Sequence, residues 1–216
     1  MIQSASGTIE QLPHAPSLGD APIPQWASSV LDLGCGDGQG MMRAASAPPL
    51  GTSRFVCGVD IDMASLQISR SNAPHLPCVR ARGEELPFQD GAFDYVISAV
   101  ALPYMDLVPT LREIRRVLRP RGELWASLHS QLLVWDHLLK SLRAFNWKDI
   151  AYRTYVLVNG FGFHFTGKLF RFPLKRVRIE SGQTRRGIRL ALQSAGFTDV
   201  MMSQGGERFI VVARRS

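Results

Sequence analysis

Cysteine is scarce in this sequence: its 216 residues include only Cys35, Cys57 and Cys78. These residues form no closely spaced pair, so a disulfide framework or a metal site is not expected, and a reducing cytoplasm is the expected compartment. The chain also lacks any run of about 18 apolar residues, and its first residues lack the basic start and apolar core of a secretory leader. Neither a membrane span nor export is therefore expected.

A third absence concerns glycine spacing. An apolar strand over 30–33 runs into a turn with glycines in strict alternation, at Gly34, Gly36 and Gly38. The pyrophosphate-binding fingerprint of dinucleotide enzymes needs its third glycine at the position held here by Gln39, so that fingerprint is broken. A glycine turn after a strand can be only a tight connection, but it can also bring backbone N–H groups and a helix N-terminus against a ligand.

Two carboxylates lie near this turn and favour a ligand-binding role for it over a simple tight connection. Asp32 precedes the first glycine, and Asp60 ends the next apolar segment, 55–60, where a carboxylate can accept hydrogen bonds from both ribose hydroxyls. Asp32 could face an ammonium group, which needs no phosphate cradle. The residues thus predict a phosphate-free nucleoside cofactor with an amino-acid tail.

At this point the sequence resembles the class I, seven-stranded S-adenosylmethionine-dependent methyltransferases, in the broad branch that includes ubiquinone and menaquinone biosynthesis enzymes. The resemblance is close from about Ser29 to Leu128, weaker from Thr184 onward and absent between them. Four segments carry it in order: 30–38, 58–62, 84–96 and 113–124.

The resemblance implies a doubly wound, mostly parallel α/β sheet of seven strands in the order 3-2-1-4-5-7-6, with strand 7 antiparallel. Alternating strand and helix patterns along the chain agree with such a sheet. Strands are expected near 29–33, 55–60, 77–81, 94–99, 122–128, 197–203 and 208–214. Helices are expected near 39–46, 63–71, 107–118 and 184–195. The segment 204–207 suits the turn of the final hairpin.

The resemblance also implies that S-adenosylmethionine is the cofactor and assigns contacts to it. Gly34 and Gly36 would lie against the methionine part and the ribose, and Asp32 would hold the amino group. Asp60 would accept the ribose hydroxyls, and Ile61 would cover one face of the adenine.

Two positions depart from the family pattern. Where the family places an acid for the adenine amino group, this chain has Arg82, followed by Gly83, whose N–H would meet the ring. Either Glu84 replaces the missing acid, or backbone and apolar contacts hold the adenine. Ser98 would approach the methionine end, and Arg121 replaces the middle glycine of the turn before the fifth strand.

The region without a family counterpart is basic and aromatic. Residues 131–187 contain 11 Lys and Arg against three acids, a net charge of +8, so the rest of the chain carries −1 of the total +7. Ten aromatic residues lie in the same segment: Trp135, Phe145, Trp147, Tyr152, Tyr155, Phe161, Phe163, Phe165, Phe170 and Phe172. These aromatics could simply be the segment's own core, with the charges on its wet face.

We interpret the chain as four parts: an extended or partly disordered lead (1–25), the cofactor-binding part (26–130), a lid insertion after strand 5 (131–187) and the C-terminal part of the same domain (188–216). A lid at the carboxyl edge of the sheet would bind substrate. Its side chains would suit a small aromatic or lipid-like molecule, with Arg and Lys as partners for a carboxylate or phosphate.

Methyl transfer needs a positioned acceptor, and it needs a proton acceptor only for a hydroxyl or similar nucleophile. His129, just past the fifth strand, is the first candidate for a general base, and His164 is the second. Tyr104 could orient the substrate. Each of the three could instead be a structural hydrogen-bonding residue.

Two alternatives stay open. The basic, aromatic segment and the sequence pI of about 9.8 also permit an RNA or DNA methyltransferase, although the fourth strand ends in Ser98-Ala99-Val100-Ala101 and not in the motif of base amino methylators. A cofactor-binding partner subunit without catalysis of its own is the other. The sequence does not determine the oligomeric state.

Overall fold

A computed structural model of the chain describes most of the predicted α/β part. The described residues are 21–51, 53–129, 139–140, 142, 145, 147–168, 183–205 and 208–216. Most of the predicted lead and most of residues 130–182 therefore lie outside the description, as does the predicted hairpin turn at Gly206 and Glu207.

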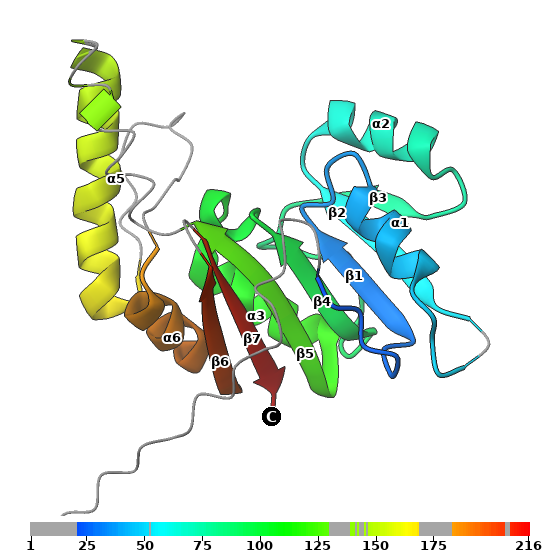
Figure 1. The fold of residues 1–216 in the computed structure, drawn as a ribbon. Helices are drawn as coiled ribbons and strands as arrows, with labels where there is room; N and C mark the ends of the chain where they lie inside the picture. The colour runs from blue at the N-terminus through cyan, green and yellow to red at the C-terminus, as the bar shows by residue number, and fades with distance from the viewer. Residues whose placement is uncertain are drawn as a thin grey trace, which may run out of the picture.

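The described strands form one seven-stranded sheet in the order β3-β2-β1-β4-β5-β7-β6, as predicted (Figure 1). Strands β1 to β5 pair in parallel, and β7 is antiparallel to both β5 and β6. The strands are β1 (Ser29–Leu33), β2 (Phe55–Asp60), β3 (Cys78–Arg80), β4 (Phe93–Ala99), β5 (Leu118–His129), β6 (Phe197–Gly205) and β7 (Arg208–Arg215).

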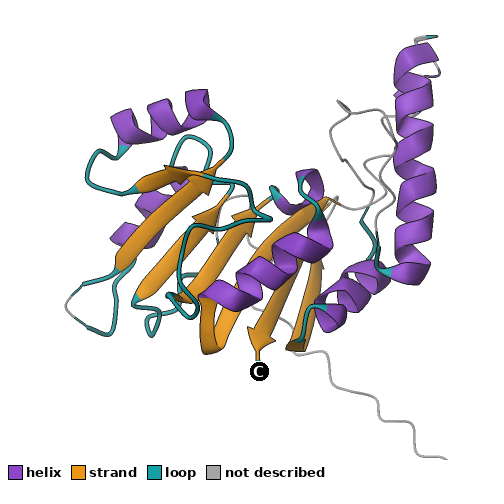
Figure 2. Cartoon of the chain, turned by 180° about the vertical axis from the view of Figure 1, so that it is seen from behind, coloured by secondary structure: helices purple, strands orange, loops and turns teal. Residues whose placement is uncertain are grey.

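Helices cover both faces of the sheet. Met41 of α1 and Leu66 of α2 join one buried cluster, whereas Leu111 of α3 and Ile188 of α6 join another across the sheet. Figure 2 shows α3 and α6 on the face opposite to that of α1. The helices are α1 (Gln39–Ser46), α2 (Met63–Asn72), α3 (Leu107–Val117), α5 (Trp147–Thr166) and α6 (Arg185–Ser194), with a 3₁₀ turn, η1 (Leu102–Tyr104).

β1 is the central element, and all five of its side chains are buried. Its alternate residues face opposite sides, so Val30 joins the α1 cluster while Leu31 and Leu33 join the α3 cluster. A strand buried on both faces is apolar at nearly all its positions, as Val30, Leu31 and Leu33 are here, and this explains why the sequence predicts it correctly.

Asp94 of β4 forms hydrogen bonds that join the amino-terminal ends of β1 and β4. One of its carboxylate oxygens accepts hydrogen bonds from the Ser28 and Ser29 backbone N–H groups, and the other pairs with Arg119 at 2.7 Å. Because this ion pair lies at the end of the sheet away from the glycine turn, Asp94 is a structural residue.

β5 begins four residues earlier than expected. Leu118 already pairs with Phe93, and an irregularity follows before Glu123 pairs with Tyr95. Arg121, in the place of the family glycine, lies within this irregularity with φ of 65°, a conformation that costs a side-chain-bearing residue about 1 kcal/mol.

α5 is a helix of 20 residues that the sequence reasoning did not predict. Its buried residues include Phe163, whose ring lies where any side chain on Gly187 of α6 would extend. Both figures show α5 beyond α6, at the β6 side of the sheet. None of the helices in the described part of the chain combines the length and hydrophobicity that a membrane span requires.

Candidate functional site

The glycine turn after β1 has the backbone that the spacing predicts. Gly34, Gly36 and Gly38 have φ of 78°, 53° and 88°, in the left-handed region that glycine alone enters without strain. A Cβ on Gly34 would lie 2.2 Å from Cβ of Ala101, whereas one on Gly36 would meet no atom within 4 Å. Gly34 is thus needed for packing, and Gly36 leaves an open cradle.

A cavity of about 530 Å³ opens beside this turn, at the carboxyl ends of the strands. It unites β1, β2 and the segments that follow β3 and β4, as the rule for binding crevices in open α/β sheets predicts. Six predicted site residues line this larger cavity: Gly34, Asp60, Ile61, Gly83, Glu84 and Tyr104.

The Asp60 carboxylate is held in one orientation. One oxygen accepts a hydrogen bond from the Gly36 backbone N–H at 2.9 Å, and the other accepts one from the Asp62 N–H at 2.9 Å. Each carboxylate oxygen has a second acceptor site, so a pair of hydroxyl donors can still bind. Ile61 beside it is 56% exposed, and an apolar side chain open to this degree suits contact with the face of a ring.

The loop after β3 is clamped to α3. Glu113 accepts a hydrogen bond from the Leu86 N–H at 2.8 Å, while the Arg116 guanidinium donates to the carbonyls of Leu86 and Phe88. These bonds join Leu86 and Phe88 of the loop to Glu113 and Arg116 of α3. They fix the backbone that presents Gly83 to the cavity.

Glu84 is already engaged. Its carboxylate accepts a hydrogen bond from the Asp106 N–H at 2.9 Å and lies 3.4 Å from the Arg82 guanidinium. Burial alone would raise the pKa of Glu84, but these bonds hold it below its usual value. Glu84 is an ionised cavity residue with few acceptor sites left.

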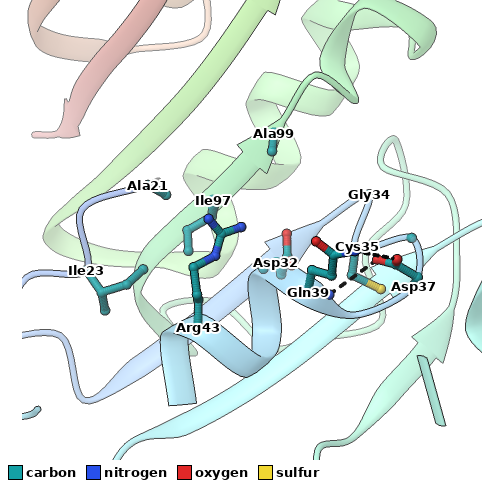
Figure 3. Close-up of a pocket in the computed structure, with 12 residues that line it drawn as sticks. Ala21, Ile23, Asp32, Gly34, Cys35, Asp37, Gln39, Arg43, Ile97 and Ala99 are labelled. Atoms are coloured by element: carbon teal, nitrogen blue, oxygen red, sulfur yellow. Dashed lines mark hydrogen bonds between the residues drawn. The ribbon is translucent and has the colours of Figure 1, made fainter. Parts of the chain in front are cut away.

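A smaller cavity of about 270 Å³ lies on the α1 side and shares Gly34 with the larger one. Figure 3 shows Asp32 of β1 and Arg43 of α1 directed into it, with Ile97 and Ala99 of β4 on its wall. The two cavities therefore meet at the first glycine of the turn. The larger cavity contains the Asp60 carboxylate, and the smaller one contains Asp32 together with Arg43.

Asp32 has an unusual environment for a carboxylate. It is 3% exposed, and burial raises its pKa from 3.8 to about 7, although Arg43 and the Met41 N–H partly oppose the rise. A Cβ on Gly40 would lie 2.3 Å from its carboxylate oxygen, so the glycine at the start of α1 makes room for this acid. A cation placed beside Asp32 would favour its ionised form.

Cys35 also borders the smaller cavity. Burial, reinforced by Asp32 and Asp60, raises the pKa of its thiol far above its ordinary value. The thiol stays protonated at neutral pH, and this agrees with the view of Cys35 as a small filler and not a nucleophile.

Three predicted residues are not placed in either cavity. Ser98 is fully buried, and its hydroxyl donates to the Leu33 carbonyl at 3.1 Å. His129 is the last residue of β5, opposite Arg208, and its side chain lies outside the described residues. His164 is on α5, with its ring 4.9 Å from that of Phe165. The roles of all three stay predictions.

Sequence reasoning missed two residues that shape the site. Met105 packs between the turns: its side chain lies where a Cβ on Gly83 would extend, 2.6 Å from that position, and 3.8 Å from the corresponding position on Gly34. Arg43 was missed because it lies one turn into an ordinary amphipathic helix. A basic residue 11 positions after Asp32, on the helix that follows the glycine turn, could have indicated Arg43. Nothing in the sequence indicated Met105.

Comparison with known proteins finds that the part of the chain that forms these cavities is similar to methyltransferases. A family model described as "Methyltransferase domain" matches residues 31–126. A 2-phytyl-1,4-naphtoquinone methyltransferase of Trichormus variabilis is 34% identical over 102 residues, which are 44% of this chain and 44% of that protein. A malonyl-[acyl-carrier protein] O-methyltransferase of Halorhodospira halophila is 37% identical over 108 residues, 47% of this chain and 35% of that one. The chain thus spans less than half the length of these relatives.

Solved structures extend the similarity in fold to most of the chain. An S-adenosylmethionine-dependent methyltransferase from Mesorhizobium loti superposes with a TM-score of 0.63 at 17% identity, over 91% of this chain and 95% of that one. A structure from the complex of the Haloferax volcanii Trm112 methyltransferase activator and a methyltransferase superposes with a TM-score of 0.63 at 18% identity. The match covers 91% of this chain and 86% of that one.

Proposed function

Because residues 31–126 of this chain form a methyltransferase domain on the class I fold, we propose that the protein transfers a methyl group from S-adenosylmethionine to a small aromatic or lipid-like molecule. One observation carries the proposal: two cavities meet at Gly34, one containing the fixed Asp60 carboxylate and the other Asp32 with Arg43. The charges of these three side chains complement those of an adenosyl amino acid.

The residues present fit this cofactor. Asp60 would accept the ribose hydroxyls, with Gly36 leaving room for the sugar, and Ile61 and Gly83 would contact the adenine from the larger cavity. Asp32 would face the ammonium group of the tail, and Arg43 would face its carboxylate. Both tail charges would then be compensated, the ammonium by the buried Asp32 and the carboxylate by the exposed Arg43.

The bound cofactor supplies an electrophilic methyl group, so the protein's task is to hold the acceptor in line and exclude water. Tyr104, on η1 and 45% exposed, borders the larger cavity and would orient the acceptor. His129, and His164 as second choice, would take a proton if the accepting atom is a hydroxyl or similar group.

Two observations support the substrate class. The naphtoquinone and acyl-carrier-protein relatives are named for lipid-like acceptors or acceptors with an acyl chain, and the insertion 131–187 combines ten aromatic residues with a net charge of +8. An apolar body with a carboxylate or phosphate would match both properties. The same basic and aromatic composition also permits a nucleic-acid substrate.

Calorimetry with S-adenosylhomocysteine tests the proposal. We expect the wild-type chain to bind it and Asp60→Ala to weaken binding by about 10- to 100-fold, because two charge-assisted hydrogen bonds are lost. With the reduced, hydroquinone form of demethylmenaquinone as a trial acceptor, whose hydroxyl proton a base can remove, His129→Ala should slow turnover by at least about tenfold at unchanged cofactor affinity.

The controls separate the two roles. Asp90→Ala removes an exposed acid that pairs with Arg116 outside both cavities and should leave binding unchanged. A wild-type chain that bound no S-adenosylhomocysteine would overturn the proposed function. Unimpaired turnover in His129→Ala would remove only that residue from the role of base.

A further inference from the structure

α5 exposes a stripe of apolar side chains that lines neither of the two cavities. Trp147, Val158, Phe161 and Phe165 are 73%, 66%, 68% and 54% exposed. We propose that this α5 stripe, together with the basic residues beside its carboxyl-terminal end, docks the protein on an anionic membrane surface.

The four residues share one face of the helix. Val158, Phe161 and Phe165 are three and four residues apart, and Trp147 lies 11 residues, about three turns, before Val158. The opposite face is occupied, because Val156, Asn159 and Phe163 are buried. From Trp147 to Phe165 the stripe extends for about 27 Å.

No charged side chain interrupts the stripe. The exposed positions between its ends on the same face are Ala151 and Thr154, both small. The rings of Phe161 and Phe165 pack edge to face at 5.0 Å, so they form one contiguous apolar tip. Surface helices normally present charged residues on their outer face, and a long uncharged face marks an interaction site.

Basic residues gather at the Phe165 end. The Arg186 guanidinium lies 5.7 Å from the centre of the Phe165 ring. Lys168 follows Phe165 by three residues, Arg185 and Arg189 are neighbours of Arg186 on α6, and all three are exposed. Within the described parts of α5 and α6 the sole acid is Asp149, which pairs with Arg153 at 3.5 Å.

This combination fits a lipid surface better than the other partners. Helices that lie on membranes place Trp and Phe at the headgroup boundary and Lys or Arg beside anionic lipids. A nucleic acid would use the cations, but the exposed aliphatic Val158 has neither a ring to stack on a base nor a hydrogen-bonding group. The surface lines neither cavity, so vesicle binding can be measured separately from cofactor binding.

Vesicle sedimentation with the full chain tests this inference. We expect wild-type protein to sediment with vesicles of equal parts phosphatidylcholine and phosphatidylglycerol and to stay in solution with pure phosphatidylcholine. The double variant Phe161→Ser/Phe165→Ser should lower the partition coefficient at least tenfold, and Arg185→Gln/Arg186→Gln should lower it severalfold. Val158→Ser should give an intermediate loss.

Leu50→Ser is the matched control, because Leu50 is a 74% exposed apolar residue far from α5 in the chain. It should sediment like wild type, and circular dichroism should show every variant folded. Equal sedimentation of wild type and the double phenylalanine variant would overturn the proposal. Failure of the wild-type protein to bind anionic vesicles would also overturn it. Binding of single-stranded RNA in that case would indicate a nucleic-acid surface. A dimer in light scattering that the phenylalanine substitutions convert to monomer would indicate a self-association surface.

Discussion

Two aspartates on neighbouring strands have opposite environments. Asp60 is partly exposed and accepts two backbone N–H groups, whereas Asp32 is buried with a pKa raised to about 7. The first arrangement favours a fixed anion that meets neutral hydroxyls. The second leaves an acid whose charge depends on what lies beside it, so its ligand affinity depends on pH.

Asp32 predicts a specific pH dependence of binding. Since its pKa in the folded chain exceeds the usual 3.8, the folded state holds a proton between about pH 4 and 7, and the stability that this proton contributes is lost as the pH rises to 7. An ammonium group binds the ionised form, so affinity for S-adenosylhomocysteine should rise about tenfold from pH 5 to 6 and level off above 7. Calorimetry across this range measures it.

Two controls accompany this measurement. Asp32→Asn should bind more weakly and lose most of the pH dependence, and 5′-methylthioadenosine, which lacks the amino-acid tail, should bind wild type with little change over the same range. A wild-type affinity that is flat from pH 5 to 7 would contradict the role of Asp32.

At the scale of elements, the site depends on how closely α1 approaches β1. Gly40, in the first turn of α1, lies against the Asp32 carboxylate, and Gly58 of β2 makes room for Met41 and Cys35 in the same way. Glycines inside a helix and a strand are unfavourable in isolation. Here each permits a contact that a methyl group would block.

Gly40→Ala tests this approach. The new Cβ would lie 2.3 Å from the Asp32 oxygen, so the carboxylate must move, and we expect S-adenosylhomocysteine affinity to fall at least tenfold. Stability should change less, by about 1 kcal/mol, because the gain in helix propensity partly offsets a clash of about 1–3 kcal/mol. Calorimetry and urea denaturation measure the two effects.

Gly51→Ala provides the comparison, since a Cβ there meets no atom within 4 Å. It should leave affinity unchanged. If Gly40→Ala bound the ligand as tightly as Gly51→Ala, the position of Asp32 would not matter for binding.

At the scale of the whole molecule, the sequence predicted the sheet because each buried strand leaves a local pattern. β1 and β2 are mostly apolar segments, β1 followed by Gly34 and β2 ending in Asp60, and the order of all seven strands followed from the family resemblance. Contacts between distant segments leave no such pattern. The clamp of Arg116 on Leu86 and the approach of Arg43 to the smaller cavity became visible only in three dimensions.

α5 was missed for a different reason. Its apolar residues occur on both faces, so the sequence lacks the single-faced periodicity by which amphipathic helices are recognised. β5 was placed four residues late because Arg121, in a left-handed conformation, was assigned to a turn and not to a bulged strand.

Ligand binding should stabilise the entire fold. At 100 times its dissociation constant a ligand adds about 2.7 kcal/mol, which raises the midpoint of thermal unfolding by several degrees for a chain of this size. Gly36→Ala should abolish this rise because a methyl group enters the open cradle, as differential scanning calorimetry with S-adenosylhomocysteine would measure.

Gly91→Ala is the matched variant for backbone strain, with φ of +66° and no nearer contact for a Cβ than 3.8 Å. Both variants should lower the midpoint of the free protein by a similar amount, near the cost of about 1 kcal/mol for a left-handed side-chain-bearing residue. Only Gly91→Ala should keep the ligand-induced rise; equal rises in both would contradict the assignment of Gly36.

The place of β7 in the sheet has a consequence for biosynthesis. This strand lies between β5 and β6, although it follows both along the chain. Until residues 208–215 have left the ribosome, β5 and β6 have no partner at the edges that β7 will fill. The nascent polypeptide therefore carries two open strand edges until translation passes this point, and chaperone protection matters most during that interval.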